Sequence, residues 1–339
     1  SDVTLAAGNT YKLSGEYIVE EGATLHIEEG VKIIAVYDDI ADYILVKQGG
    51  KINAVGTPDK PIVMTSEKEE PGAWGGIHIC GRAHTNAEGG KGSSEIGGAV
   101  YGGNDDADNS GTLQYIRLEY TGFAFDEEHE ANGISFYGVG NGTIVDHCQA
   151  YKGSDDGFEF FGGSVNVSNL VAVSCSDDSF DWTEGWNGKG TNLVAYQEAE
   201  STLGYDCDCL MECDNNGSNN AATPVAHPVL KNLILVGNGG SKQGIRLRAG
   251  TEVEIDNAKV CGKGQPLTVE TALTENALKN GTSKLTNITL TSELSSKEGI
   301  YTHADFIAVT SNKVDANLSY SSFEDIRKEC SWMNGSWVK

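Results

Sequence analysis

Short strands recur along the chain, each with apolar residues on both sides of one polar position. The first apolar residues of six such segments are Ile77, Ile134, Phe158, Phe180, Met211 and Ile245. Because side chains alternate between the two faces of a strand, these six are predicted to point inward and the residue after each to point outward. The outward residues are His78, Ser135, Glu159, Asp181, Glu212 and Arg246. The pattern predicts stacked strands and makes a helical fold improbable.

Two neighbouring segments, residues 153–162 and 175–185, have similar amino-acid sequences and align with a period of 22 residues. A repeat this short cannot bury a hydrophobic face alone, so neighbouring repeats must stack around one shared core. The chain is therefore predicted to be a single elongated solenoid. Wider spacing elsewhere predicts inserted loops near residues 82–112, 123–131 and 197–208, and such loops on one face often bind ligands.

A second column places an asparagine before an apolar residue in each repeat. Its members are Asn169, Asn192, Asn232, Asn257 and Asn287. Stacked asparagines at a corner can hydrogen-bond their amides from one coil to the next. We interpret this column as structural.

Composition narrows the class of protein further. The chain has 43 glycines and 6 prolines, which favours many strands joined by turns. A net charge of −25 makes nucleic acid an unfavourable partner, because phosphate binding needs clustered Lys and Arg. No apolar run is long enough to span a membrane, and the chain opens at Ser1 without the basic region and apolar core of a signal peptide. The chain is therefore expected to be soluble as given, with any export signal removed or never present.

The eight cysteines suggest an oxidising compartment. They are Cys80, Cys148, Cys175, Cys207, Cys209, Cys213, Cys261 and Cys330. Structural disulfides together with buried thiols are expected in preference to a metal site, because no pair has zinc-site spacing with partner histidines. The pairing stays open.

Several phrases resemble a known family, the right-handed parallel β-helix proteins of bacterial cell surfaces. The matching phrases are residues 22–33, 49–66, 74–77, 101–106 and 154–163, and the resemblance covers about residues 10–250. It implies an all-β, right-handed, single-stranded parallel β-helix with inserted loops. It also implies an outer-membrane, lipoprotein-like or otherwise exported protein that associates with an outer-membrane receptor, although the lipid-anchored cysteine of usual members is absent here and leaves the anchor open.

The repeat extends to about residue 293, and residues 294–339 are predicted to form a C-terminal cap. Residues 322–330 suit a short helix with Ser322 at its N-cap. Solenoid ends need caps to hide open strand edges. Trp332 and Trp337 are expected to pack onto the last coil.

Candidate chemistry concentrates in residues 154–217, which hold thirteen acidic side chains and the single basic residue Lys189. Carboxylates on successive coils repel each other unless a cation or protons intervene. A first hypothesis is therefore a hard cation, with Ca²⁺ as the candidate and no organic cofactor. Its predicted ligands are Asp155, Asp156, Glu159, Asp177, Asp178, Asp181 and Glu212. The alternative is a solvated acidic face whose Asp-Asp pairs only make turns.

Two further hypotheses use the same face. In the first, the face binds a glycan or a surface protein through Phe161, Trp182, Trp186, Tyr205, Arg246 and Arg248, with Tyr137 nearby. In the second, a polysaccharide lyase or glycoside hydrolase uses Glu159, Asp181 and Glu212 with Arg246 against an acidic glycan. Fold analogy is most of the support for an enzyme, so we assign no catalytic residue. The preferred interpretation is a secreted or surface-exposed ligand-binding protein with a bound cation.

Overall fold

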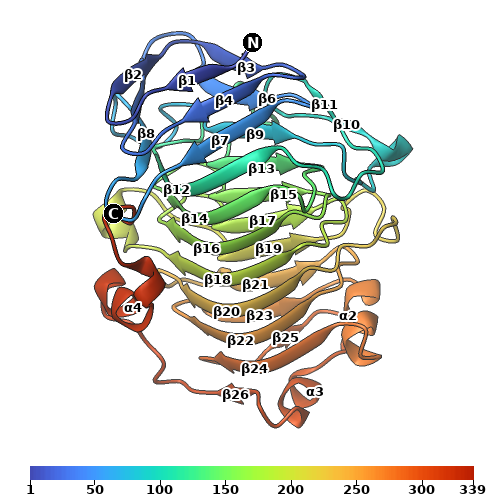
Figure 1. The fold of residues 1–339 in the computed structure, drawn as a ribbon. Coiled ribbons are helices and arrows are strands. Elements are labelled where there is room, and N and C mark those ends of the chain that lie inside the picture. Colours follow the sequence, from blue (N-terminus) through green and yellow to red (C-terminus); the bar gives the residue numbers. More distant parts are fainter.

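The computed structural model describes residues 1–339 and shows a right-handed parallel β-helix whose strands stack into two long sheets (Figure 1). The first sheet contains β1 (Val3–Leu5), β4 (Thr24–Ile27), β7 (Lys51–Val55), β12 (Gly111–Glu119), β14 (Ile144–Tyr151), β16 (Asn166–Val173), β18 (Lys189–Tyr196), β20 (Val229–Val236), β22 (Glu254–Cys261), β24 (Lys284–Leu290) and β26 (Lys313–Val314), together with β2 (Thr10–Leu13), β5 (Lys32–Ala35) and β8 (Ile62–Ser66). The second contains β3 (Glu16–Val19), β6 (Tyr43–Val46), β9 (Ile77–Cys80), β13 (Ile134–Tyr137), β15 (Phe158–Phe161), β17 (Phe180–Thr183), β19 (Met211–Asp214), β21 (Gln243–Arg248), β23 (Gln265–Val269) and β25 (Ser295–Ser296).

Helices are short and lie outside these sheets. They are α1 (Glu200–Leu203), α2 (Ala272–Lys279), α3 (His303–Ala308) and α4 (Phe323–Glu329), with 3₁₀ turns at η1 (Glu88–Gly90) and η2 (Ser331–Met333). A small antiparallel pair, β10 (Gly92–Ser93) and β11 (Val100–Tyr101), lies in the long loop between β9 and β12. No helix of the structure combines the length and the apolar character that a membrane span requires.

The predicted inward column is confirmed. Ile77, Ile134, Phe158, Phe180, Met211 and Ile245 pair in register from β9 to β21, and all are buried. They belong to one core cluster of 60 buried residues that fills the solenoid between the sheets. Stacked rings such as Phe158 and Phe180, with centroids 5.6 Å apart, continue from coil to coil. The aligned register fixes which side chains point outward.

The asparagine ladder is also present. Asn192 donates to Asn169 at 2.9 Å, Asn232 donates to Asn192 at 3.1 Å, and Asn257 donates to Asn232 at 2.8 Å. Asn287 leaves the series because its amide donates to Asp256. All five asparagines have φ between 54° and 64°, the left-handed region that Asn tolerates better than most residues. The column therefore both bends the strand and links the coils.

Replacing Asn192 with alanine is expected to lower the free energy of unfolding by about 2–3 kcal/mol. The loss combines two hydrogen bonds, each worth about 1 kcal/mol net, with the cost of an alanine at positive φ. Asn192→Gly removes the same hydrogen bonds without that backbone cost, so it should lose less. Equilibrium urea unfolding of both variants measures the difference, and unchanged midpoints in both would contradict a structural role for the ladder.

The disulfides expected from the cysteine count are not formed. All eight cysteines are free and buried. Cys148, Cys175 and Cys213 lie within the main core cluster, where a thiol packs as a small apolar side chain. Burial raises the pKa of Cys175 to about 12, so this thiol stays protonated and unreactive.

The C-terminal segment confirms one prediction and corrects another. α4 begins after Ser322, whose hydroxyl accepts a hydrogen bond from the backbone of Asp325, as predicted. Residues 294–314 lie on the last coil, where β25 pairs with β23 and β26 pairs with β24. Trp332 and Trp337 do not pack there, however, because the chain from α4 onward leaves the last coil. This last part of the chain runs back along the outer face of the first sheet (Figure 1). The backbone of Trp337 donates to the carbonyl of Pro58, and its ring contacts Tyr115. A separate cluster of ten buried residues forms where this segment meets the sheet.

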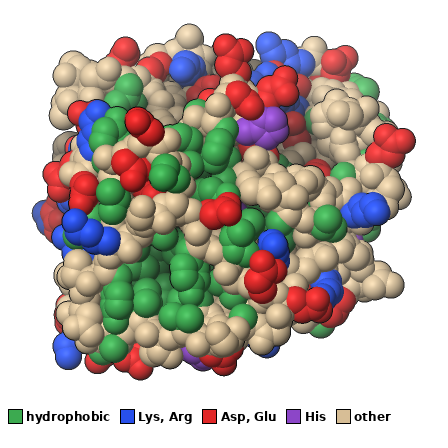
Figure 2. All heavy atoms as spheres, turned by 90° about the horizontal axis from the view of Figure 1, so that it is seen from above, with side chains coloured by type: hydrophobic (Ala, Val, Ile, Leu, Met, Phe, Trp, Pro, Cys, Tyr) green, Lys and Arg blue, Asp and Glu red, His purple; other side chains and the backbone are tan.

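Hydrophobic side chains gather on the end face of the solenoid at the N-terminal side (Figure 2). A pocket there is lined by Leu5, Tyr11, Leu13, Tyr17, Leu25, Ile33 and Ile44 with Lys12. The apolar residues among these belong to the main core cluster or pack against it, and the same cluster continues through the following coils. The end face is thus a cross-section of the solenoid core.

Candidate functional site

The outward column of the second sheet carries the predicted carboxylates in register. Glu159 on β15 pairs with Asp181 on β17, which pairs with Glu212 on β19. Arg246 follows Glu212 on the next strand. Since parallel strands lie about 4.8 Å apart, each carboxylate lies directly beside the next.

Two more columns enter the site from the turns before these strands. Asp155, Asp177 and Asp208 each lie three residues before an inward residue, and Asn132, Asp156 and Asp178 each lie two residues before one. Their backbones continue the ladder, since Gly157 donates to the carbonyl of Asp178. The repeat itself therefore brings acidic side chains from three coils to one place.

The seven predicted metal ligands, Asp155, Asp156, Glu159, Asp177, Asp178, Asp181 and Glu212, form what we call the acidic cluster. Three triads have their oxygens within 4.8 Å of one another: Asp155, Asp156 and Asp177; Asp156, Glu159 and Asp181; and Asp178, Asp181 and Glu212. Shared members connect the triads. Two oxygens on one Ca²⁺, each 2.3–2.6 Å from the ion, are separated by at most about 5 Å, so this spacing suits a shared hard cation.

Only Glu212 in the acidic cluster has a basic partner. It contacts Arg246 at 3.2 Å and Arg248 at 3.0 Å. The other six carboxylates form no ion pair. Their hydrogen bonds come from neutral donors: Asn132 donates to Glu159 at 2.7 Å, and the backbone of Asp178 donates to Asp156 at 2.9 Å.

Burial and mutual repulsion raise the pKa of these carboxyl groups. For Asp155, desolvation and the nearby charge of Asp177 raise the pKa to about 9. Desolvation, followed by neighbouring carboxylates, also raises the pKa of Asp156, Glu159, Asp178 and Asp181 well above the ordinary value. In the absence of a cation the cluster therefore holds protons at neutral pH.

Asn132 supplies a second indication of a ligand. Its side chain is fully buried, and its amide nitrogen donates to Glu159 and to Ser135. Its amide oxygen has no hydrogen-bond partner. A buried oxygen without a donor costs free energy, and a neutral amide oxygen is a usual ligand of Ca²⁺.

The long loop between β9 and β12 covers the outward face next to the acidic cluster. Its Tyr101 hydroxyl contacts both oxygens of Glu184 at 2.9 Å, and its Asn86 donates to Asn215 at 2.8 Å. Glu95 of this loop lies close enough to add its charge to Glu159, and burial raises the pKa of Glu95 to about 7. The loop makes one wall of the site more acidic and less hydrated.

Arg246 and Arg248 lie at the opposite boundary, where both are partly exposed. Arg246 also contacts Glu270 at 3.1 Å, and Arg248 contacts Asp214 at 2.8 Å. Their guanidinium groups are therefore already engaged by protein carboxylates. A ligand carboxylate at this boundary has to share them.

The aromatic contacts expected for a ligand are contradicted by burial. Trp182 and Trp186 are each 1% exposed and belong to the core. Trp182 lies two residues after Phe180 and therefore points inward, and Trp186 stacks on Phe160 with centroids 4.0 Å apart. Phe161 points outward, but it packs with Tyr137 under the covering loop.

Tyr205 is the one predicted aromatic contact that keeps partial exposure. Its hydroxyl donates to the carbonyl of Ser174 at 2.7 Å, so the ring is held against the turn after β16. Tyr205 therefore stays a predicted contact for a ligand. Of the ligand-binding residues predicted, Tyr205, Arg246 and Arg248 are accessible.

Sequence reasoning missed Asn132, Asp208 and Glu95. The first two follow the same register as the acidic turns, and extending the alignment by one coil on each side finds them. Asp208 forms a further triad with Asp178 and Cys209 within 4.8 Å. Glu95 lies in an inserted loop that follows no repeat, so no local pattern identifies it.

Comparison with known proteins finds one family model that matches nearly the whole chain. The chain matches the family model described as a pectate-lyase-like β-helix domain over residues 1–338. Among solved structures it is similar to the crystal structure of the Dettilon tailspike protein, with a TM-score of 0.31 and 8% sequence identity over 85% of this chain and 52% of that chain. The chain thus spans about half the length of that tailspike. No curated protein matches it.

Proposed function

The chain belongs to the pectate-lyase-like β-helix domain family, and from that premise we propose that it is a secreted or surface protein that binds a glycan through a cation in the acidic cluster. The observation that carries the proposal is the group of six carboxylates without a basic partner, drawn from successive coils and flanked by the unpartnered oxygen of Asn132. Oxygen-only donors favour Ca²⁺ over softer metals.

The cation links the protein to its ligand. A bound Ca²⁺ neutralises part of the acidic cluster, and its remaining coordination positions accept carboxylate or hydroxyl oxygens of a glycan. Without the cation, an acidic glycan meets a repulsive surface, since the chain carries a net charge of −25. A surface protein that presents carboxylates fits the same chemistry, and association with an outer-membrane receptor is a further proposal from the same interpretation.

The test uses a triple variant, Glu159→Gln, Asp181→Asn and Glu212→Gln, compared with the wild-type protein. After chelator treatment, added Ca²⁺ is expected to raise the unfolding midpoint of the wild-type protein, because a ligand at 100 times its Kd stabilises the native state by about 2.7 kcal/mol. The triple variant should show no rise. The wild-type protein is expected to bind polygalacturonate only when Ca²⁺ is present.

A matched control removes the same number of charges elsewhere. Asp39, Glu88 and Glu293 are exposed and form no hydrogen bond or ion pair through their side chains. Their triple replacement by Asn and Gln should leave the Ca²⁺ response intact. An unchanged response in the Glu159, Asp181 and Glu212 variant, or no response in the wild-type protein, contradicts the proposal and leaves a solvated acidic face.

A second candidate is glycan cleavage by the same carboxylates. Burial, followed by the neighbouring carboxylates, raises the pKa of Glu159 and Asp181, which favours the protonated form that a general acid requires. Adjacent carboxyls are spaced more like the pair of a retaining hydrolase, about 5–5.5 Å, than that of an inverting one. Release of products from an acidic glycan, abolished by Asp181→Asn, would favour this candidate.

A further inference from the structure

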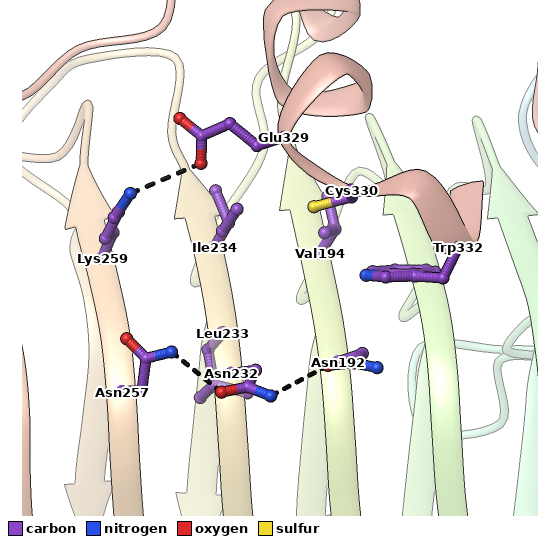
Figure 3. Close-up of a pocket in the computed structure, with 10 residues that line it drawn as sticks. All are labelled: Asn192, Val194, Asn232, Leu233, Ile234, Asn257, Lys259, Glu329, Cys330 and Trp332. Atoms are coloured by element: carbon purple, nitrogen blue, oxygen red, sulfur yellow. Dashed lines mark hydrogen bonds and ion pairs between the residues drawn. The ribbon is translucent and has the colours of Figure 1, made fainter. Parts of the chain in front are cut away.

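A groove on the outer face of the first sheet lies between the asparagine ladder and the C-terminal segment (Figure 3). It has a volume of about 390 Å³, within the range of sites for small molecules. The acidic cluster lies on the second sheet, so this groove is a separate feature. Its residues come from β18, β20 and β22 on one side and from α4 and η2 on the other.

The ladder lines one side of the groove with unsatisfied amide capacity. Asn192, Asn232 and Asn257 each use one amide N–H in the ladder, and no other side-chain hydrogen bond engages these groups. Each amide therefore keeps one N–H donor and an accepting lone pair. Asn257 ends the series, because Asn287 donates elsewhere, and its oxygen accepts no bond. The result is a row of paired donors and acceptors spaced by about 4.8 Å.

Trp332 closes one end of the groove, with its ring presented toward the cavity (Figure 3). The other four tryptophans, Trp74, Trp182, Trp186 and Trp337, are at most 1% exposed, whereas Trp332 is partly exposed. Trp332 lies on η2, directly after α4. An ion pair between Lys259 Nζ on β22 and Glu329 Oε2 on α4, 3.4 Å apart, links α4 to the sheet. Trp332 is thus the single tryptophan that a ligand can reach.

The charges of the groove balance. Lys259 and Glu329 pair with each other, and the remaining side chains are amides, Trp332, the thiol of Cys330 and aliphatic groups such as Val194 and Ile234. A ligand with a net charge gains no unpaired partner here. A ligand with apolar faces and hydroxyl edges matches both the aromatic end and the amide row.

We infer that this groove binds a short neutral oligosaccharide. One pyranose ring packs its C–H face on the indole of Trp332, and ring hydroxyls donate to and accept from the amides of Asn192, Asn232 and Asn257. The rung spacing is close to the length of one sugar unit, so successive residues of the oligosaccharide meet successive asparagines. This inference is independent of the cation and of the acidic cluster.

The experiment uses acrylamide quenching of tryptophan fluorescence, which reports Trp332 because the other four rings are buried. Trisaccharides of glucose, galactose, mannose and N-acetylglucosamine are titrated into the wild-type protein, with saturation-transfer NMR as a second readout. At least one is expected to protect Trp332 from quenching and to receive saturation. Protection by none of them overturns the inference, as does protection by a proline-rich peptide alone.

Variants separate binding from folding. Trp332→Ala is expected to weaken the trisaccharide at least tenfold by saturation transfer, and Asn257→Gly, which keeps the positive φ of 64°, several-fold. Asp39→Asn, at an exposed residue outside both the groove and the acidic cluster, should leave affinity unchanged. Unaltered binding by both groove variants contradicts the inference, and the wild-type quenching result stands even if Trp332→Ala loosens the C-terminal segment.

Discussion

Trp186→Ala is expected to lower the free energy of unfolding by about 3–5 kcal/mol, the usual cost of removing a large buried aromatic side chain. Trp186 is 1% exposed and stacks on Phe160 at 4.0 Å, and its indole N–H donates to the carbonyl of Val165 at 3.0 Å. The substitution leaves both a cavity and an unpaired carbonyl. Urea unfolding followed by far-UV circular dichroism measures the loss.

Trp186→Phe provides the comparison. It keeps a ring against Phe160 but removes the indole N–H, so it should lose clearly less than the alanine variant. Because repeat proteins can unfold in segments, the slope of the transition has to be compared along with its midpoint. Wild-type stability in Trp186→Ala would contradict the core placement and restore a ligand contact as the role of this residue.

The repeat made most of the fold predictable. Alternation identified the inward residues Phe158 and Phe180, and the same register then aligned Glu159, Asp181 and Glu212 on one face. The asparagine column followed from the same alignment. These signals are local, because each coil repeats the environment of the previous one.

The aromatic part of the site was not predictable from the same signals. The alternation already placed Trp182 inward, two residues after Phe180, so its interpretation as a ligand contact conflicted with the pattern. Phe161 points outward, and its burial depends on the loop that Tyr101 fastens to Glu184, 83 residues away. Such contacts between inserted loops follow no period in the sequence.

The C-terminal segment shows the same limit over a longer distance. Its helix after Ser322 was readable from local capping, but the return of the segment to Pro58 was not. That return places Trp332 beside the asparagine ladder. The asparagine ladder, interpreted from the sequence only as structural, therefore also forms one side of a groove.

The two sheets differ in the kind of polar side chain that they stack on their outer faces. On the second sheet, repeated acids crowd together under a covering loop and require protons or a cation. On the first sheet, neutral amides bond to one another and keep spare capacity toward solvent. The same solenoid repeat therefore places the proposed cation site and the proposed oligosaccharide groove on different faces.

The chelator-stripped protein is expected to lose stability as the pH rises from about 4 to about 9. The pKa of Asp155 is about 9 in the folded protein, against about 3.9 for an unfolded aspartate, and the other buried carboxyls shift in the same direction. Between these values the native state binds more protons than the unfolded state, so stability falls with pH by up to about 1.4 kcal/mol per pH unit for each group. The carboxyls titrate together, so their contributions do not simply add.

Asp156→Asn and added Ca²⁺ should both flatten this dependence, for different reasons. Asp156 is buried at the centre of two triads, and an amide there removes one charge that has to be protonated. Ca²⁺ instead favours the ionised carboxylates, so it should stabilise the wild-type protein most at pH 8–9 and least near pH 4, where protons compete with it. Thermal unfolding across this range, with and without Ca²⁺, measures both effects. Stability of the stripped protein that stays level or rises with pH over this range would contradict the protonated cluster, and with it the reason for expecting a cation there.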